Sequence, residues 1–84
     1  MSENPSVDVR FFAGAAHAFG TQQRTVQADT FGALLAALRS DASEDARTVL
    51  SRSSFLLNSA ACSDESAALS AGDRVDVLPP FAGG

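Results

Sequence analysis

Hydrophobic and polar residues alternate in two short segments near the two ends of the chain. Residues 7–12 place one set of side chains on each side: Val7, Val9 and Phe11 against Asp8, Arg10 and Phe12. Residues 73–78 alternate in the same way. A period of two predicts half-buried strands. The polar segment 21–27 predicts a strand near a sheet edge that forms a hairpin with the first, and the short apolar run 54–58 predicts another strand.

Residues spaced for a helix follow the second predicted strand. Four large side chains form one apolar stripe: Phe31, Leu34, Leu35 and Leu38. Asp29 or Thr30 is suited to cap the N-terminus of this helix. Gly32 lies inside it and weakens it by about 1 kcal/mol relative to alanine. A second helical segment is expected over residues 44–52.

The remaining segments are predicted to be connections. Residues 13–20 are small and read as a flexible loop, and residues 59–72 as a long connection with one short strand or turn. The element order predicts an α+β fold with one main helix packed across a mixed sheet. We expect one domain over residues 1–84, with an ordered core over about 7–78 and a C-terminal tail over 79–84.

Composition limits what this fold can contain. Hydrophobic residues make up 45% of the 84 residues, but 16 of them are alanine. Only 20 Val, Leu and Phe side chains remain, enough for one small core and not for a large buried active site. The formal charge is −4 and every cation is an arginine, which argues against a surface that follows nucleic-acid phosphates.

The scarce reactive residues exclude further classes of site. The single cysteine cannot form an internal disulfide, and one cysteine with one histidine cannot supply a structural zinc site. His17 is interpreted as an exposed loop residue and Cys62 as a small filler in the connection. No apolar run is long enough to span a membrane, and residues 1–5 do not form a signal peptide. The sequence therefore predicts a soluble cytoplasmic protein without a bound metal.

The last six residues differ from an ordinary domain end. The strand at 73–78 runs directly into Pro79 and Pro80, which lack backbone N–H groups and hold an extended direction. Phe81 and Ala82 follow, and then Gly83 and Gly84, which have no side chains. Six residues reach about 20 Å. Such a tail can thread a narrow channel, and it indicates chemistry on the C-terminal carboxylate inside another protein's active site.

The ending Pro79-Pro80-Phe81-Ala82-Gly83-Gly84 resembles the C-terminus of the MoaD/ThiS sulfur carriers, and the double proline favours the molybdopterin branch over the thiazole carriers. Residues 9–13, Leu57-Asn58 and residues 69–73 resemble further family segments. The resemblance implies a β-grasp, ubiquitin-like fold with the first and last strands parallel and adjacent. It also implies a docking surface of Phe12, Leu78 and Ala61, the last of which is often larger in relatives. Ala16-His17 departs from the Arg-Glu that relatives often carry.

The resemblance implies a carrier that is not catalytic alone. A MoeB-like enzyme would adenylate Gly84 with MgATP, and a sulfur donor would convert it to a thiocarboxylate. The tail, Pro79 to Gly83 with Gly84 at its end, would enter a MoaE-like large subunit in a heterotetramer and pass sulfur to cyclic pyranopterin monophosphate. Other readings stay open: a sulfur carrier for thiazole, cysteine or tRNA thiolation, a ubiquitin-like modifier joined through Gly84 to lysines, or a plain binding module.

Overall fold

The computed structural model describes residues 4–80. The strands are β1 (Ser6–Phe11), β2 (Gln23–Gln27), β3 (Ser54–Leu57), β4 (Ala60–Ala61) and β5 (Arg74–Leu78). The helices are α1 (Gly14–Phe19), α2 (Phe31–Ser40) and α3 (Glu44–Arg52). This is an α+β arrangement, as the alternating and helical patterns of the sequence predicted, and it is the β-grasp fold that the family resemblance implied.

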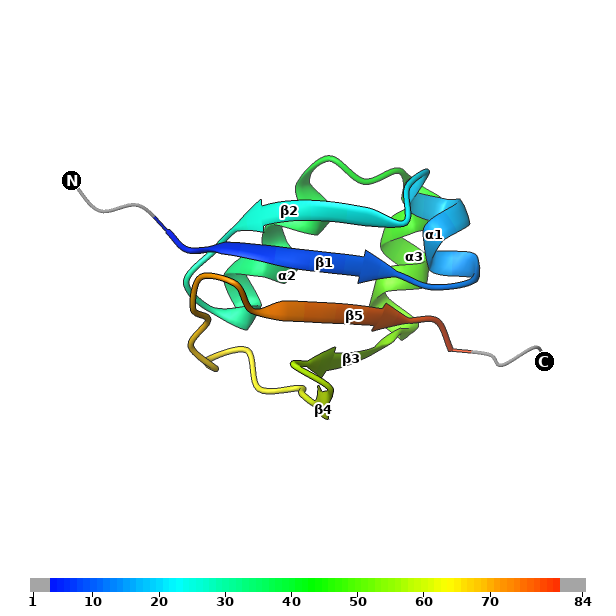
Figure 1. Cartoon of the computed structure of the whole chain (residues 1–84). Coiled ribbons are helices and arrows are strands. Elements are labelled where there is room, and N and C mark those ends of the chain that lie inside the picture. The colour runs from blue at the N-terminus through cyan, green and yellow to red at the C-terminus, as the bar shows by residue number, and fades with distance from the viewer. Residues whose placement is uncertain (1–3, 81–84) are drawn as a thin grey trace.

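The five strands form one mixed sheet in the order β2-β1-β5-β3-β4 (Figure 1). β1 pairs antiparallel with β2 and parallel with β5, with Val9 opposite Val75. β3 pairs antiparallel with both β5 and β4. The prediction that the first and last strands lie side by side is therefore confirmed, as is the edge position of β2.

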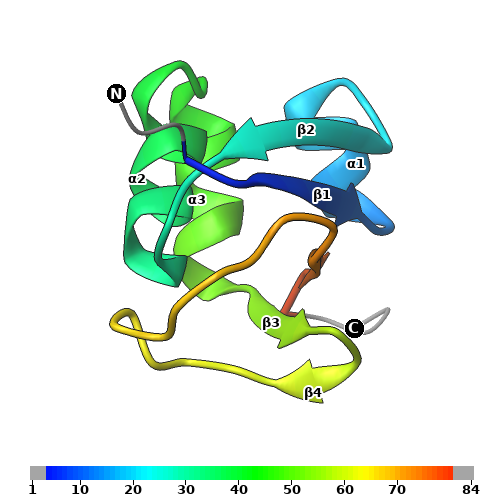
Figure 2. The ribbon, with the colours of Figure 1, turned by 60° about the vertical axis from the view of Figure 1, so that its left-hand side comes forward.

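The core lies between the sheet and the helices α2 and α3, which cover one face of the sheet (Figures 1 and 2). Side chains at alternate strand positions enter it, and α2 contributes its apolar stripe: Val7, Val9, Phe11, Val75 and Val77 meet Phe31, Leu34, Leu35 and Leu38. The opposite sheet face carries the other set of alternate positions. We call it the outer face.

The prediction of a flexible loop after β1 was wrong, because residues 14–19 form α1. His17 is exposed as expected, but it lies on this helix and not in a loop. β1 and β2 pair antiparallel as predicted, although their connection contains a helix. The helix is held by its aromatic end: the ring of Phe19 stacks on Phe11 with centroids 4.6 Å apart. Gly20 then ends the helix at φ 74°, a conformation that glycine adopts without strain.

Local interactions explain the other element boundaries. Of the two candidate caps, Thr30 is the one used, since its hydroxyl accepts from the Ala33 N–H at 3.1 Å. Ser43 caps α3 in the same way through Ala46. The 59–72 connection contains β4 as its one short strand. Within residues 4–80, no helix has the length and apolar character needed to cross a bilayer.

Candidate functional site

The candidate site lies where the neighbouring strands β1 and β5 both end, at the same end of the sheet. The two strands run parallel, and the Phe12 N–H donates to the Val77 carbonyl at 3.2 Å. Phe12 is 39% exposed and is the one large hydrophobic residue in the described chain that the structure leaves this open. Leu78 follows Val77 and is half-buried. By strand alternation both side chains belong to the outer face.

Two further apolar residues extend this surface across the sheet. Leu56 pairs with Asp76 on one side and Ala61 on the other, so all three share the outer face. Leu56 is half-buried and Ala61 exposed. Phe12, Leu56, Ala61 and Leu78 together form what we call the outer-face patch. Sequence reasoning missed Leu56 because the continuous apolar run Phe55-Leu56-Leu57 shows no alternation.

The backbone after Phe12 fixes where its side chain points. Ala13 adopts φ 48° and ψ −125°, a conformation that favours glycine, and the Ala15 N–H donates to the Phe12 carbonyl at 2.9 Å. This tight turn leads into α1, which the Phe11–Phe19 stack holds against β1. A hollow of about 440 Å³ borders Phe12, with Ala16, Gln22 and Gln23 among its lining residues.

The rest of the outer face is polar and internally paired. Arg10 Nε lies 2.9 Å from an Asp8 carboxylate oxygen along β1. Arg74 Nε lies 2.7 Å from Asp76 along β5. These neighbouring ion pairs leave little net charge on this face, so the outer-face patch is its distinctive apolar feature.

The tail leaves the sheet beside this patch. Leu78 is the last residue of β5 and pairs with Ser54 at the start of β3. Pro79 is half-buried and Pro80 exposed, and neither can donate a backbone hydrogen bond to a further strand. Phe81, Ala82, Gly83 and Gly84 lie outside the described residues.

Side chains that could perform chemistry are dispersed. In residues 4–80, no group of three or more His, Cys, Asp or Glu side chains is placed to hold a metal ion. His17 is exposed on α1, whereas Cys62 is half-buried against the core beside β3. The described part of the chain therefore offers a surface and an exit point for the tail rather than an assembled catalytic site.

Solved structures share this fold over nearly the whole chain. A chain in the protein–protein complex of subunits 1 and 2 of molybdopterin-converting factor from Helicobacter pylori is 26% identical, with a TM-score of 0.74, covering 94% of this chain and 99% of that one. SAMP1 from Haloferax volcanii is 29% identical, with a TM-score of 0.67 and the same coverages. The small archaeal modifier protein 1 from Methanosarcina acetivorans, 19% identical, shows the fold alone, with a TM-score of 0.82 over all of both chains.

No curated protein sequence matches this chain. The model of the ThiS family matches residues 9–84, which include the second half of β1, all of β5 and the tail. The chain therefore belongs to the ThiS family of ubiquitin-like sulfur carriers.

Proposed function

We propose that this chain is a MoaD-type sulfur carrier, the small subunit of a molybdopterin synthase. The observation that carries the proposal is the parallel pairing of β1 and β5, which sets the exposed Phe12 beside the strand that leads into the Pro79-Pro80 stem. A partner that binds the outer-face patch would receive the tail in the same encounter. The likeness to a chain from a complex of molybdopterin-converting factor subunits 1 and 2 supports the same assignment.

The chemistry would take place on Gly84. A carboxylate is a poor electrophile, so a MoeB-like partner would join it to AMP from MgATP, with pyrophosphate leaving. The terminal sulfur of a donor persulfide would then attack the carbonyl carbon and expel AMP. This attack would leave Gly84 joined to the donor through an acyl disulfide. A thiol would then attack the donor's sulfur, form a disulfide with the donor, and release Gly84 as a thiocarboxylate.

The described residues would act by binding and positioning. The outer-face patch would dock on the activating enzyme and on a MoaE-like large subunit. Phe12 and Leu78 would make the apolar contacts with both partners. Pro79 and Pro80 would direct Phe81 to Gly84 into the partner's active site, because prolines restrict the backbone to extended conformations. The large subunit would supply the groups that transfer sulfur to cyclic pyranopterin monophosphate.

Complementation tests the pathway. The gene for this chain is expressed in a strain that lacks its molybdopterin synthase small subunit, and in parallel in one that lacks its thiazole carrier. We expect molybdoenzyme activity to return in the first strain only. Rescue of the second strain alone would overturn the molybdopterin assignment and leave a carrier of another pathway.

Mass spectrometry tests the chemistry on Gly84. With a cognate activating enzyme, ATP and a sulfur donor, the intact mass should rise by the difference between sulfur and oxygen. A chain lacking Gly84 is the control, which should fold normally and gain no sulfur. An unchanged mass of the full chain under conditions that modify a known carrier would contradict the proposal.

A protein modifier is the second candidate. The observation that favours it is the 29% identity to SAMP1 of Haloferax volcanii over 94% of this chain. In that case Gly84 would form an isopeptide bond with lysines of target proteins. The absence of lysine from this sequence would prevent lysine-linked chains of the protein itself. Branched peptides joining Gly84 to lysine in a host lysate would support this candidate.

A further inference from the structure

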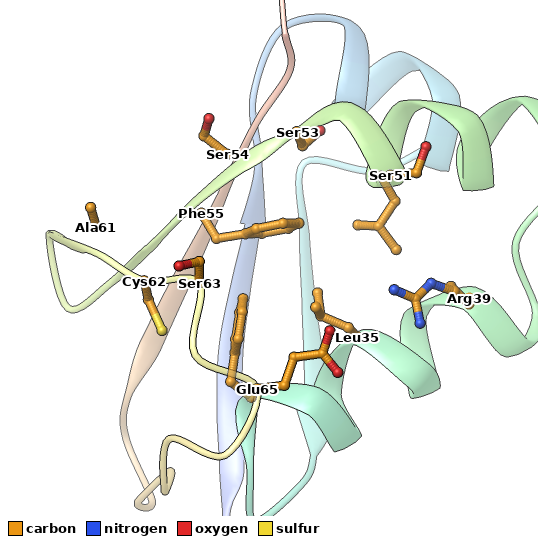
Figure 3. Close-up of a pocket in the computed structure, with 12 residues that line it drawn as sticks. Leu35, Arg39, Ser51, Ser53, Ser54, Phe55, Ala61, Cys62, Ser63 and Glu65 are labelled. Atoms are coloured by element: carbon orange, nitrogen blue, oxygen red, sulfur yellow. The ribbon is translucent and has the colours of Figure 1, made fainter.

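A second hollow lies mainly on the helix side of the sheet and shares only Ala61 with the outer-face patch. It has a volume of about 460 Å³ and opens between α2, the end of α3, β3 and residues 61–65 (Figure 3). Phe31, Leu35, Leu50 and Phe55 supply its apolar surface. We call it the helix-side groove. Its volume falls in the range of sites that accept small ligands or a peptide segment.

Two charged side chains border the groove at different points along α2. Arg39 reaches over it from α2 and Glu65 from the 61–65 segment (Figure 3). Among residues 4–80, neither side chain takes part in an ion pair, whereas Arg10, Arg24 and Arg74 all do. Glu65 packs against Gly32 in the first turn of α2, whereas Arg39 lies in the last turn, so the part of the groove beside the C-terminal end of α2 is the part suited to an anion.

The groove begins where the tail leaves the sheet. Ser53 and Ser54 line it, and Ser54 is the β-sheet partner of Leu78, the last residue of β5. Four residues follow Pro80, enough to reach about 13 Å. They comprise one aromatic side chain, Phe81, and a terminal glycine that carries a carboxylate wherever Gly84 ends the chain.

We propose that the helix-side groove binds the chain's own tail, with Phe81 against Phe55 and Leu35 and the Gly84 carboxylate directed to Arg39. The occupant matches the groove in chemistry, since an aromatic ring meets the apolar surface and an anion meets a guanidinium. The tail also starts close to the groove, at the end that Ser53 and Ser54 line.

Docking of this kind would be in equilibrium with an extended tail. A short tether holds the tail near the groove at an effective concentration in the millimolar range, so even weak binding fills the groove part of the time. The importance of this equilibrium rests on the proposed function: a docked tail is withheld from the activating enzyme, and a partner that captures the extended form shifts the population.

Cys62 provides the test, because it is the only cysteine of the chain and it lines the groove. The rate of its alkylation by iodoacetamide, a neutral reagent, is measured on the purified protein without any activating enzyme. Deleting residues 81–84 should raise this rate about twofold or more if the groove is at least half filled. Phe81→Ser and Arg39→Gln should each raise it part of the way.

Matched variants separate docking from nonspecific effects. Arg52→Gln removes the same charge from α3 outside the groove and should leave the rate unchanged. Arg39→Gln should have no effect in the chain that already lacks residues 81–84. Circular dichroism checks that each variant is folded.

Equal alkylation rates in the full and shortened chains would overturn the proposal. Protection that increases with protein concentration would also overturn it, because the tail would then come from a second copy. The outcome is independent of sulfur transfer, so a failure here leaves the proposed function standing. The reverse also holds, since a chain that never receives sulfur could still dock its tail.

Discussion

The backbone N–H of Phe12 donates to the carbonyl oxygen of Val77 at 3.2 Å, which aligns the end of β1 with the end of β5. Because β1 and β5 run parallel, their last outer-face side chains, Phe12 and Leu78, emerge at the same edge of the sheet. The tail begins one residue after Leu78. Under the proposed function, a partner bound at this surface would also receive the tail.

A charge at Phe12 should remove partner binding without unfolding the protein. Phe12→Asp places a carboxylate where we propose an apolar contact, and we expect at least tenfold weaker binding to a cognate activating enzyme, as for the loss of an interface anchor worth about 1.4 kcal/mol or more. The unfolding free energy should fall by no more than about 1–2 kcal/mol, because the side chain is only partly covered by the rest of the protein.

Calorimetric titration and urea unfolding measure these two effects. Gln27→Asp is the control, since this exposed residue of β2 lies at the other end of the sheet. A large loss of stability in Phe12→Asp would place the side chain in the core and contradict the docking role.

Replacing Ala13 with glycine should stabilise the protein. Ala13 is held at φ 48° and ψ −125°, where a Cβ atom is strained and glycine is not. We expect Ala13→Gly to raise the unfolding free energy by about 0.5–1 kcal/mol, after the entropy lost by glycine is included. Ala18→Gly, within α1, is the control and should lower it by about the same amount. A destabilised Ala13→Gly would show that the turn is unstrained.

Adding a methyl group at Gly32 should destabilise the protein, even though alanine favours helices. A Cβ atom there would lie 3.0 Å from both the Cβ atom and the carbonyl oxygen of Glu65, and the Gly32 N–H donates to that oxygen at 2.9 Å. The overpacking costs about 1–3 kcal/mol. The gain in helix propensity returns about 1 kcal/mol. We therefore expect Gly32→Ala to lower the unfolding free energy by about 1 kcal/mol.

Urea unfolding measures the Gly32→Ala effect. Ala36→Gly, at an exposed position of α2, calibrates propensity alone and should cost about 1 kcal/mol. A Gly32→Ala variant more stable than the natural chain would contradict this prediction. It would mean that the segment around Glu65 moves away from the added methyl group at no cost in free energy.

Acid should weaken the link between β5 and the β3–β4 hairpin. The Asp73 carboxylate accepts from the Ser70 N–H at 2.8 Å and from the Asn58 side-chain amide at 3.0 Å. These hydrogen bonds, the Ser70 bond first, lower the pKa of Asp73. A lowered native pKa contributes stability that is present above the unfolded pKa of about 3.9 and is lost as pH falls through the native value.

The Asp73→Asn variant isolates this contribution. It should be less stable than the natural chain near neutral pH, and the difference should shrink as pH falls below about 4. Urea unfolding across that range measures it. Hydrogen bonds from Ser66 and Arg24 also lower the pKa of Asp64 and Asp41, so only the difference between the two chains reports on Asp73. A constant difference at all pH values would contradict the assignment.

Two strands and the main helix were predictable because each obeys a local period. Alternation marked β1 and β5, and the stripe from Phe31 to Leu38 marked α2. The tail motif likewise consists of residues that are adjacent in the sequence. The sequence alone could therefore identify Gly84 and the Pro79-Pro80 stem as candidate site residues. The fold class and the family resemblance both followed from such local order.

Long-range contacts decided the rest. α1 forms because Phe19 stacks on Phe11, a contact that the small residues between them do not signal. Leu56 joins the outer-face patch only through its register with Asp76 and Ala61. Gly32 is required by Glu65, far along the chain, and the helix-side groove combines residues from four separate segments. A local pattern predicts which face of a strand or helix a side chain occupies. The residues that the side chain contacts across the fold depend on how the strands pair and the helices pack in three dimensions.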